Sequence, residues 1–199
     1  GKADLVVANY VQWTAKGDKY CSMDGSTKSY CTPESYAGYP LKLYHNLGNG
    51  RCEEVAKKAG LGDPTSKSLG IAVVDYNNDG WPDLFIANDT QPNKLYKNLH
   101  NGTFKDVAVE VGIALSTEGK ARAGMGIDAA DFDNSGKPGV AITNFDNEMI
   151  GLYSLSNGNF SDVAVREGLG LPSKNKLGFG CVFEDINLDG LLDLLVVNG

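Results

Sequence analysis

The chain has 199 residues, of which 42% are hydrophobic and 22% charged, so it can build one large folded domain or two small ones. Its net charge of −7 argues against a nucleic-acid-binding protein, because contact with a phosphate backbone requires a basic surface. No apolar run approaches the roughly 18 residues of a membrane span. Twenty-five glycines and few runs of helical period favour an all-β protein of short strands and many turns.

Residues 1–69 contain short apolar runs and one long insertion. The run at residues 4–9 repeats the pattern of residues 83–88, which places Gly1 at the position of Gly80. The insertion, residues 10–40, is rich in Tyr, Ser, Gly and Lys, and it stands where the later copies of the pattern need only a short connection. A loop this long inside a compact domain is usually functional or disordered. Two roles stay open: an aromatic recognition loop, or a flap over the edge of its own sheet.

The cysteines fall into two kinds. Cys21 and Cys31 lie ten residues apart inside the insertion. A disulfide closing a loop of this size stabilises by roughly 3 kcal/mol, whereas zinc binding would need companion Cys or His residues at zinc spacing. Because disulfides persist in oxidising compartments, the pair predicts an extracellular or periplasmic protein. Cys52 and Cys181 fall on strand positions, and we expect a buried thiol at each.

An acidic loop at residues 75–83 lies between two apolar runs, residues 70–74 and 84–87. Oxygen-bearing side chains occupy loop positions 1, 3, 5 and 9, and Gly80 at position 6 allows the positive φ of a sharp turn. Calcium takes about six to eight oxygen ligands, so this spacing suits a calcium site. An ordinary acidic hairpin turn is the alternative, since Asn, Asp and Gly are common turn residues. The candidate ligands are the side chains of Asp75, Asn77, Asp79 and Asp83 and the backbone carbonyl of Trp81.

The acidic loop recurs with starts at Asp131 and Asp185, so its three copies follow one another at nearly equal spacing. The last copy keeps the full pattern. Its candidate ligands are the side chains of Asp185, Asn187, Asp189 and Asp193 and the carbonyl of Leu191.

The middle loop, residues 131–139, departs from this pattern. Position 9 is Gly139, and Lys137 brings a positive charge close to the loop. We therefore expect a weak or vacant site at Asp131, Asp133 and Ser135. Near the N-terminus, Asp4 is the last ligand of a truncated loop.

Each copy predicts four short strands, with the acidic loop joining the first strand to the second and an Asn-Gly turn before the fourth. Four-stranded units of this length arrange radially as blades of a β-propeller, and about four to eight blades close the ring. The chain is therefore a partial propeller, with the remainder of its own propeller as a partner. Insertion 10–40 should project from the end opposite the acidic loops. The expected units are residues 1–69 (strands two to four), 70–125 and 126–179 (whole blades), and 180–199 (strands one and two).

The start Phe179-Gly180, the acidic loop pattern and the even spacing of its three copies together resemble the FG-GAP/VCBS repeats. The phrases at residues 75–89 and 93–108 resemble the ASPIC/UnbV branch of that family. The resemblance covers nearly the whole chain. It implies a calcium-stabilised β-propeller, seven-bladed when complete, in an extracytoplasmic location, with this chain as an internal fragment. It implies no established activity.

Catalytic residues are not evident in the sequence. His45 falls in a strand and His100 at a turn, and neither has a nucleophile nearby in the chain. Asp89 and Asp146 each follow a recurring asparagine, and both should lie at the end of the sheets opposite the acidic loops. They could cap turns, or they could act as a general acid and a general base. We therefore expect a non-catalytic binding, adhesion or assembly module that contacts a protein or glycan through insertion 10–40. The alternative is a secreted carbohydrate-active enzyme of the lyase or hydrolase kind.

Overall fold

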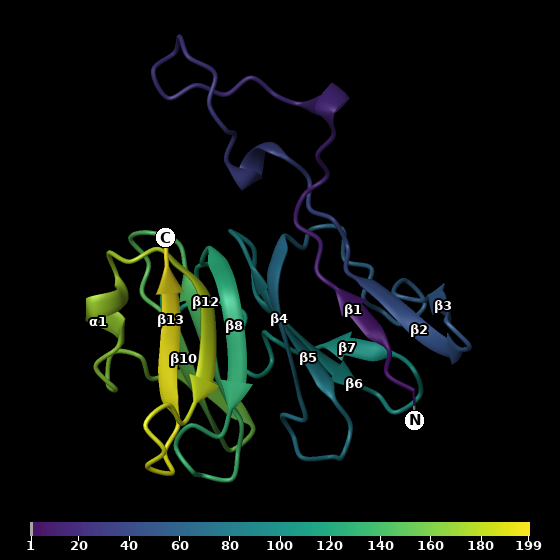
Figure 1. Ribbon diagram of the computed structural model, residues 1–199, viewed down its shortest axis with the longest axis vertical. Coiled ribbons are helices and arrows are strands. Elements are labelled where there is room, and N and C mark those ends of the chain that lie inside the picture. The colour runs from purple at the N-terminus through teal and green to yellow at the C-terminus, as the bar shows by residue number, and fades with distance from the viewer. Residues whose placement is uncertain (1) are drawn as a thin grey trace.

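The computed structural model describes residues 2–199, so the position expected for Gly1 lies outside the described residues. Antiparallel sheets follow one another along the chain, which confirms the all-β prediction (Figure 1). None of the helices among residues 2–199 is long and apolar enough to cross a membrane. The first sheet holds β1 (Leu5–Val7), β2 (Lys42–Gly48) and β3 (Arg51–Glu54); the second holds β4 (Ser68–Val74), β5 (Asp83–Asn88), β6 (Lys94–Asn98) and β7 (Phe104–Asp106). The third holds β8 (Gly124–Ala130), β9 (Gly139–Asn144), β10 (Gly151–Ser156) and β11 (Asn159–Asp162); the fourth holds β12 (Gly178–Glu184) and β13 (Asp193–Asn198). Short helical turns lie at η1 (Ala15–Gly17), η2 (Pro33–Ser35) and α1 (Gly170–Ser173).

The core lies between successive sheets. In β5, Leu84 and Ile86 pack in the cluster shared with the first sheet, while Phe85 packs in the cluster shared with the third sheet. This alternation follows from the period of two along a strand, which sends neighbouring side chains to opposite faces. Phe85 meets Phe160 of β11 edge to face, with ring centroids 5.5 Å apart. Every residue of β5, and likewise of β9 in the third sheet, is therefore buried because both faces of these strands are covered.

The first strands of three sheets, β4, β8 and β12, lie side by side (Figure 1). Glycines stand where their backbones approach most closely. A Cβ on Gly70 would lie 3.1 Å from the carbonyl oxygen of Met125, and a Cβ on Gly126 would lie 2.1 Å from that of Phe179. At Gly180, the same position of the last repeat, nothing lies within 4 Å. The recurring glycine is therefore required wherever another repeat packs against it.

The strand pairs β4–β5, β8–β9 and β12–β13 share one register. Each has an irregularity near its beginning and ends on the acidic loop, where position 9 pairs with the last strand residue before the loop. All three acidic loops consequently lie at one end of the sheets, and insertion 10–40 projects from the opposite end, as the strand connectivity predicts (Figure 1).

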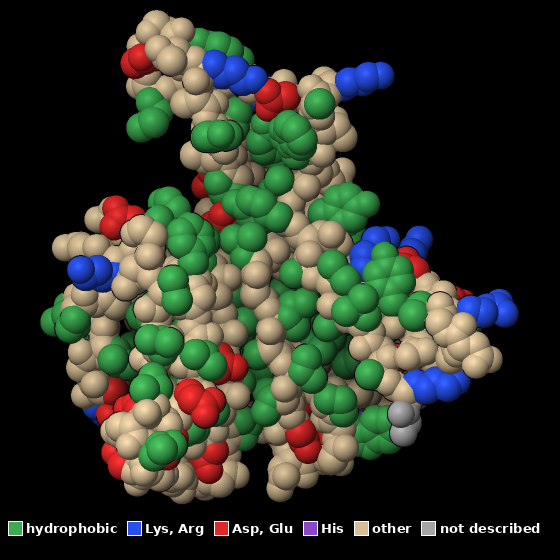
Figure 2. All heavy atoms as spheres, viewed as in Figure 1, with side chains coloured by type: hydrophobic (Ala, Val, Ile, Leu, Met, Phe, Trp, Pro, Cys, Tyr) green, Lys and Arg blue, Asp and Glu red, His purple; other side chains and the backbone are tan. Residues whose placement is uncertain are grey.

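The insertion docks on the second sheet. The Tyr10 hydroxyl donates to Asp89, and the Tyr39 N–H donates to the Ser66 carbonyl at 2.9 Å. Gly38 fits closely here, since a Cβ on it would lie 2.3 Å from the same carbonyl oxygen. These contacts fix the base of the insertion, while its tip stands clear of the sheets as an arm (Figure 2).

The disulfide between Cys21 and Cys31 is formed, which confirms that prediction. The prediction of a buried thiol at Cys52 is wrong, because the residue is exposed on β3. Its counterpart Phe160 is buried by the sheet before it, whereas among residues 2–199 no sheet precedes the one that contains Cys52. Cys181 is half-buried, and burial raises the pKa of its thiol to about 11.

Candidate metal-binding loops

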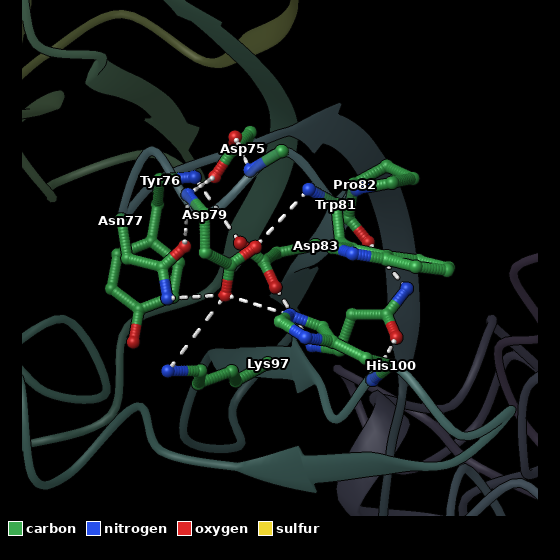
Figure 3. A network of polar contacts seen from close by, with 11 residues as sticks. Asp75, Tyr76, Asn77, Asp79, Trp81, Pro82, Asp83, Lys97 and His100 are labelled. Carbon is green, nitrogen blue, oxygen red and sulfur yellow. Dashed lines mark hydrogen bonds and ion pairs between the residues drawn. The ribbon is translucent and has the colours of Figure 1, made fainter.

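The loop at residues 75–83 is held in shape by its own carboxylates (Figure 3). Asp75 accepts hydrogen bonds from the backbone N–H groups of Asp79 at 3.0 Å and Gly80 at 2.7 Å. Gly80 has φ +84°, the positive value expected for position 6, and Asn78 at position 4 is also left-handed at φ +58°. Asn and Gly tolerate this conformation better than other residues, so the Asn-Asp-Gly run folds into this turn locally.

Three donors converge on one oxygen of Asp79, as Figure 3 shows. Its Oδ2 accepts from Asn77 Nδ2 at 2.8 Å, lies 3.0 Å from His100 Nε2, and lies 3.9 Å from Lys97 Nζ. Partial burial raises the pKa of Asp79. The hydrogen bonds from Asn77 and His100 lower it by a larger amount together, so the pKa lies below its usual value. Neighbouring side chains therefore stabilise the charged form of this carboxylate.

His100 also stacks on the indole of Trp81, with ring centroids 5.0 Å apart. This arrangement was not predicted from the sequence, in which His100 is an isolated turn residue. The repeat pattern could not predict this contact, because the His100–Trp81 pair occurs in one repeat only.

Asp83 is fully buried at the end of the loop. One oxygen accepts from the Asn98 N–H at 2.7 Å, and the other accepts from the Tyr76 N–H at 3.2 Å. Burial raises the pKa of this carboxyl, and the charges of Asp79 and Asp75 raise it too, against the effect of those hydrogen bonds. The loop therefore places a buried carboxylate beside two others.

Among residues 2–199, no three Asp, Glu, His or Cys side chains are already gathered as a metal cluster. The carboxylates of the loop face N–H donors instead. The fit to calcium consequently lies in the donor set of residues 75–83, three carboxylates and an amide oxygen at alternate positions, which matches the preference of a hard cation.

The loop at residues 185–193 repeats this hydrogen bonding. Asp185 accepts from the N–H groups of Asp189 at 3.0 Å and Gly190 at 2.8 Å, and Asn187 Nδ2 donates to Asp189 at 3.0 Å. Among the described residues, no Lys, Arg or His forms an ion pair with Asp189. The remaining predicted positions belong to the same turn: Leu191 donates its N–H to Asp189 at 2.9 Å, and Asp193 accepts from the Ile186 N–H at 3.2 Å.

The middle loop keeps the turn but lacks a ligand. Asp131 accepts from the N–H groups of Ser135 and Gly136, both at 2.8 Å. At position 9, a Cβ on Gly139 would lie 2.2 Å from the ring of Phe132. That ring stacks on Phe183 of the fourth sheet, with centroids 5.6 Å apart. An aromatic contact between sheets therefore occupies the space that a carboxylate would need.

In the first sheet, Asp4 has the hydrogen bonding of the last acidic-loop residue, position 9, which is Asp83 in the second sheet. It accepts from the Asn46 N–H at 2.8 Å, as Asp83 does from Asn98, and lies 3.1 Å from His45 Nδ1. His45 is therefore at the loop end of the sheets. The other candidate acid–base residue, Asp89, is buried at the opposite end beneath the insertion.

Asp146 is exposed after β9, where it accepts from Asn147 Nδ2 at 2.9 Å. It shares the insertion end of the sheets with Asp89, since both follow the second strand of their sheet. The structure thus separates these two aspartates from His45 and does not bring the three together.

The FG-GAP-like repeat family matches the chain over residues 1–86, 75–142 and 131–196. Cartilage acidic protein 1 of Mus musculus is 32% identical over 174 residues, which cover 80% of this chain and 25% of the relative. The proteins of the same name from Homo sapiens and Xenopus tropicalis are 29% and 28% identical, again over 80% of this chain and 24% and 25% of the relatives. The chain thus spans about a quarter of the length of these curated relatives. Because the repeat matches extend over nearly every residue, this chain belongs to the FG-GAP-like repeat family.

Proposed function

We propose that the chain forms part of a calcium-stabilised β-propeller that acts as a binding, adhesion or assembly module. The radial arrangement is supported by the inner strands β4, β8 and β12, which lie side by side with glycines at their contacts. It is also supported by the second and third sheets, each of which buries both of its faces against neighbouring sheets. Propeller blades pack in this way around an axis.

Calcium is the proposed ion because one donor set recurs in two loops, and this observation carries the proposal. Asp75, Asn77, Asp79 and Asp83 would hold one ion, and Asp185, Asn187, Asp189 and Asp193 would hold the other. The carbonyls of Trp81 and Leu191 complete the two sets. The ion would offset the mutual repulsion of three carboxylates and hold each loop closed. The loop at residues 131–139 would bind weakly, since the Phe132 ring fills the place of its last ligand.

An extracellular or periplasmic location is proposed from the disulfide between Cys21 and Cys31, which persists in an oxidising compartment. Calcium sites also occur in extracellular modules, which bind the ion weakly.

Partner binding is assigned to insertion 10–40, which stands clear of the sheets and exposes Trp13, Tyr20 and Tyr30. Exposed aromatic residues are enriched at recognition surfaces. The binding role is favoured over a carbohydrate-active enzyme, because His45 and Asp89 lie at opposite ends of the sheets.

Thermal unfolding with and without calcium tests the proposal. Calcium at 100 times its Kd stabilises by about 2.7 kcal/mol per site, which for a chain of this size raises Tm by roughly 5–11 °C. We expect EDTA to abolish this rise and Asp79→Ala to remove much of it. Ser135→Ala, the matched change in the middle loop, should have little effect. A Tm that is indifferent to both EDTA and added calcium would rule out the metal assignment.

A further inference from the structure

The arm formed by insertion 10–40 contains a hollow of about 480 Å³. Three aromatic residues line it together with polar ones: Trp13, Asp18, Lys28, Ser29, Tyr30, Cys31 and Tyr36. Trp13 is 55% exposed and Tyr30 is fully exposed, so solvent reaches the ring surfaces. A volume of this size is within the range of small-molecule sites, roughly 300–1,000 Å³.

Asp18 holds the walls of the hollow in place. One of its oxygens accepts from Trp13 Nε1 at 3.1 Å and from the Tyr36 hydroxyl at 3.3 Å, and the other pairs with Lys28. These donors, Lys28 first, hold the pKa of Asp18 below its usual value, so the carboxylate stays charged. The disulfide between Cys21 and Cys31 closes the segment that carries these residues. The site is consequently ordered before any ligand arrives, which lowers the entropic cost of binding.

The groups left free in the hollow are hydrogen-bond donors and ring faces. Both oxygens of Asp18 are already engaged, whereas the Lys28 side chain is 55% exposed and keeps N–H groups to donate. Tyr30 adds a hydroxyl and an open ring. Aromatic faces carry partial negative charge and attract the C–H groups of a sugar ring. Free donors beside open rings suit a saccharide that brings acceptors of its own.

The charge distribution of the chain also bears on the charge of the ligand. Within residues 10–40, three lysines balance three carboxylates, so the net charge of −7 resides entirely in the rest of the chain. The arm itself is thus electrically neutral, and it projects away from the acidic loops, so an anion is repelled less here than at the other end of the sheets (Figure 1).

We propose that this hollow binds a saccharide bearing carboxylate or sulfate groups. A sugar ring stacks on Trp13 and Tyr30, and the anionic group pairs with Lys28. Asp18 is a positioning residue. This inference rests on the proposed binding role of the insertion and names its ligand class. A protein partner is disfavoured because protein hot spots lie within contact areas of about 800 Å² per partner, and this hollow is of small-molecule size.

Nuclear magnetic resonance of the indole N–H groups tests the proposal, because the chain has two tryptophans, Trp13 and Trp81. The probes are a hyaluronan hexasaccharide, a heparin hexasaccharide and neutral maltohexaose. We expect an acidic hexasaccharide to shift the Trp13 resonance and leave that of Trp81 unmoved. A response to hyaluronan indicates carboxylate recognition, and a response to heparin alone indicates sulfate recognition. Added salt should weaken both, since it screens the contact with the exposed Lys28.

Substitutions separate this site from the rest of the arm. Lys28→Ala and Tyr30→Ala should each weaken binding at least tenfold, which corresponds to about 1.4 kcal/mol. The matched control is Tyr20→Ala, an exposed tyrosine of the arm outside the hollow, and it should bind as the unaltered protein does.

Three outcomes would overturn the proposal: an equal response to maltohexaose, no response to either acidic probe, or unchanged binding in both the Lys28→Ala and Tyr30→Ala variants. A Trp13 shift with a mixture of tryptic peptides and none with the saccharides would instead assign the hollow to a protein partner. Calcium-dependent melting is measured on the same samples. Retained calcium dependence without saccharide binding refutes this inference alone, whereas the reverse result refutes the calcium proposal alone.

Discussion

Replacing Gly126 by alanine tests the packing of one repeat against another. The added methyl would lie 2.1 Å from the carbonyl oxygen of Phe179, far inside the 3.4 Å at which ordinary contact begins. Thr143, which is fully buried, bridges the same two strands: it accepts from the Gly126 N–H at 2.9 Å and donates to the Phe179 carbonyl at 3.0 Å. Overpacking costs about 1–3 kcal/mol, and a lost buried hydrogen bond adds about 1 kcal/mol, so we expect a total of about 2–4 kcal/mol.

The matched control is Gly180→Ala, which makes the same change at the same position of the last repeat. Nothing lies within 4 Å of the added methyl there, and alanine in a strand is better than glycine by about 0.5–1 kcal/mol. In thermal unfolding of the 199-residue chain, Gly126→Ala should lower Tm by roughly 4–16 °C, whereas Gly180→Ala should leave it unchanged or raise it. Equal effects of the two substitutions would refute the side-by-side packing of the first strands.

Three further changes follow from local conformation, burial and the disulfide. Leu188 is left-handed at φ +61° and 86% exposed, so Leu188→Asn should stabilise by about 1 kcal/mol, seen as a higher urea midpoint; an unchanged midpoint would contradict the strain. Burial raises the pKa of Asp89 in the folded state, so the charged carboxylate destabilises the fold. The free energy of unfolding therefore falls as the pH rises from the pKa in the unfolded chain, about 3.9, through the higher pKa in the folded protein. Asp89→Asn keeps an acceptor for Tyr10 and should remove that fall, whereas an identical pH dependence of the urea midpoint in both proteins would argue against it. Replacing Cys21 and Cys31 by serine should speed amide hydrogen exchange within residues 10–40 and leave the sheets protected; protection retained throughout the arm would show that the disulfide does not order it.

Local patterns in the sequence account for the strands, the turns and the disulfide. Continuous apolar runs predicted β5 and β9, and the Asn-Asp-Gly run predicted the left-handed turn around Gly80, because both depend on neighbours close in the chain. The disulfide between Cys21 and Cys31 could be predicted for the same reason, since the two residues are ten positions apart. The candidate calcium ligands also came from spacing alone, and they stay a prediction that the melting experiment decides.

Long-range contacts decided what the repeat pattern left undetermined. Cys52 shares a repeat position with Phe160 and is nevertheless exposed, because burial on a sheet face depends on which sheet lies opposite. His100 pairs with Asp79, and Phe132 fills the space beside Gly139 while it stacks on Phe183; both pairs, His100 with Asp79 and Phe132 with Phe183, are distant in the chain. The docking of Tyr10 on Asp89 spans 79 residues. Periodicity in the chain therefore defines the repeating unit, whereas the packing of one unit against another determines which faces are buried and which loops keep space for an ion.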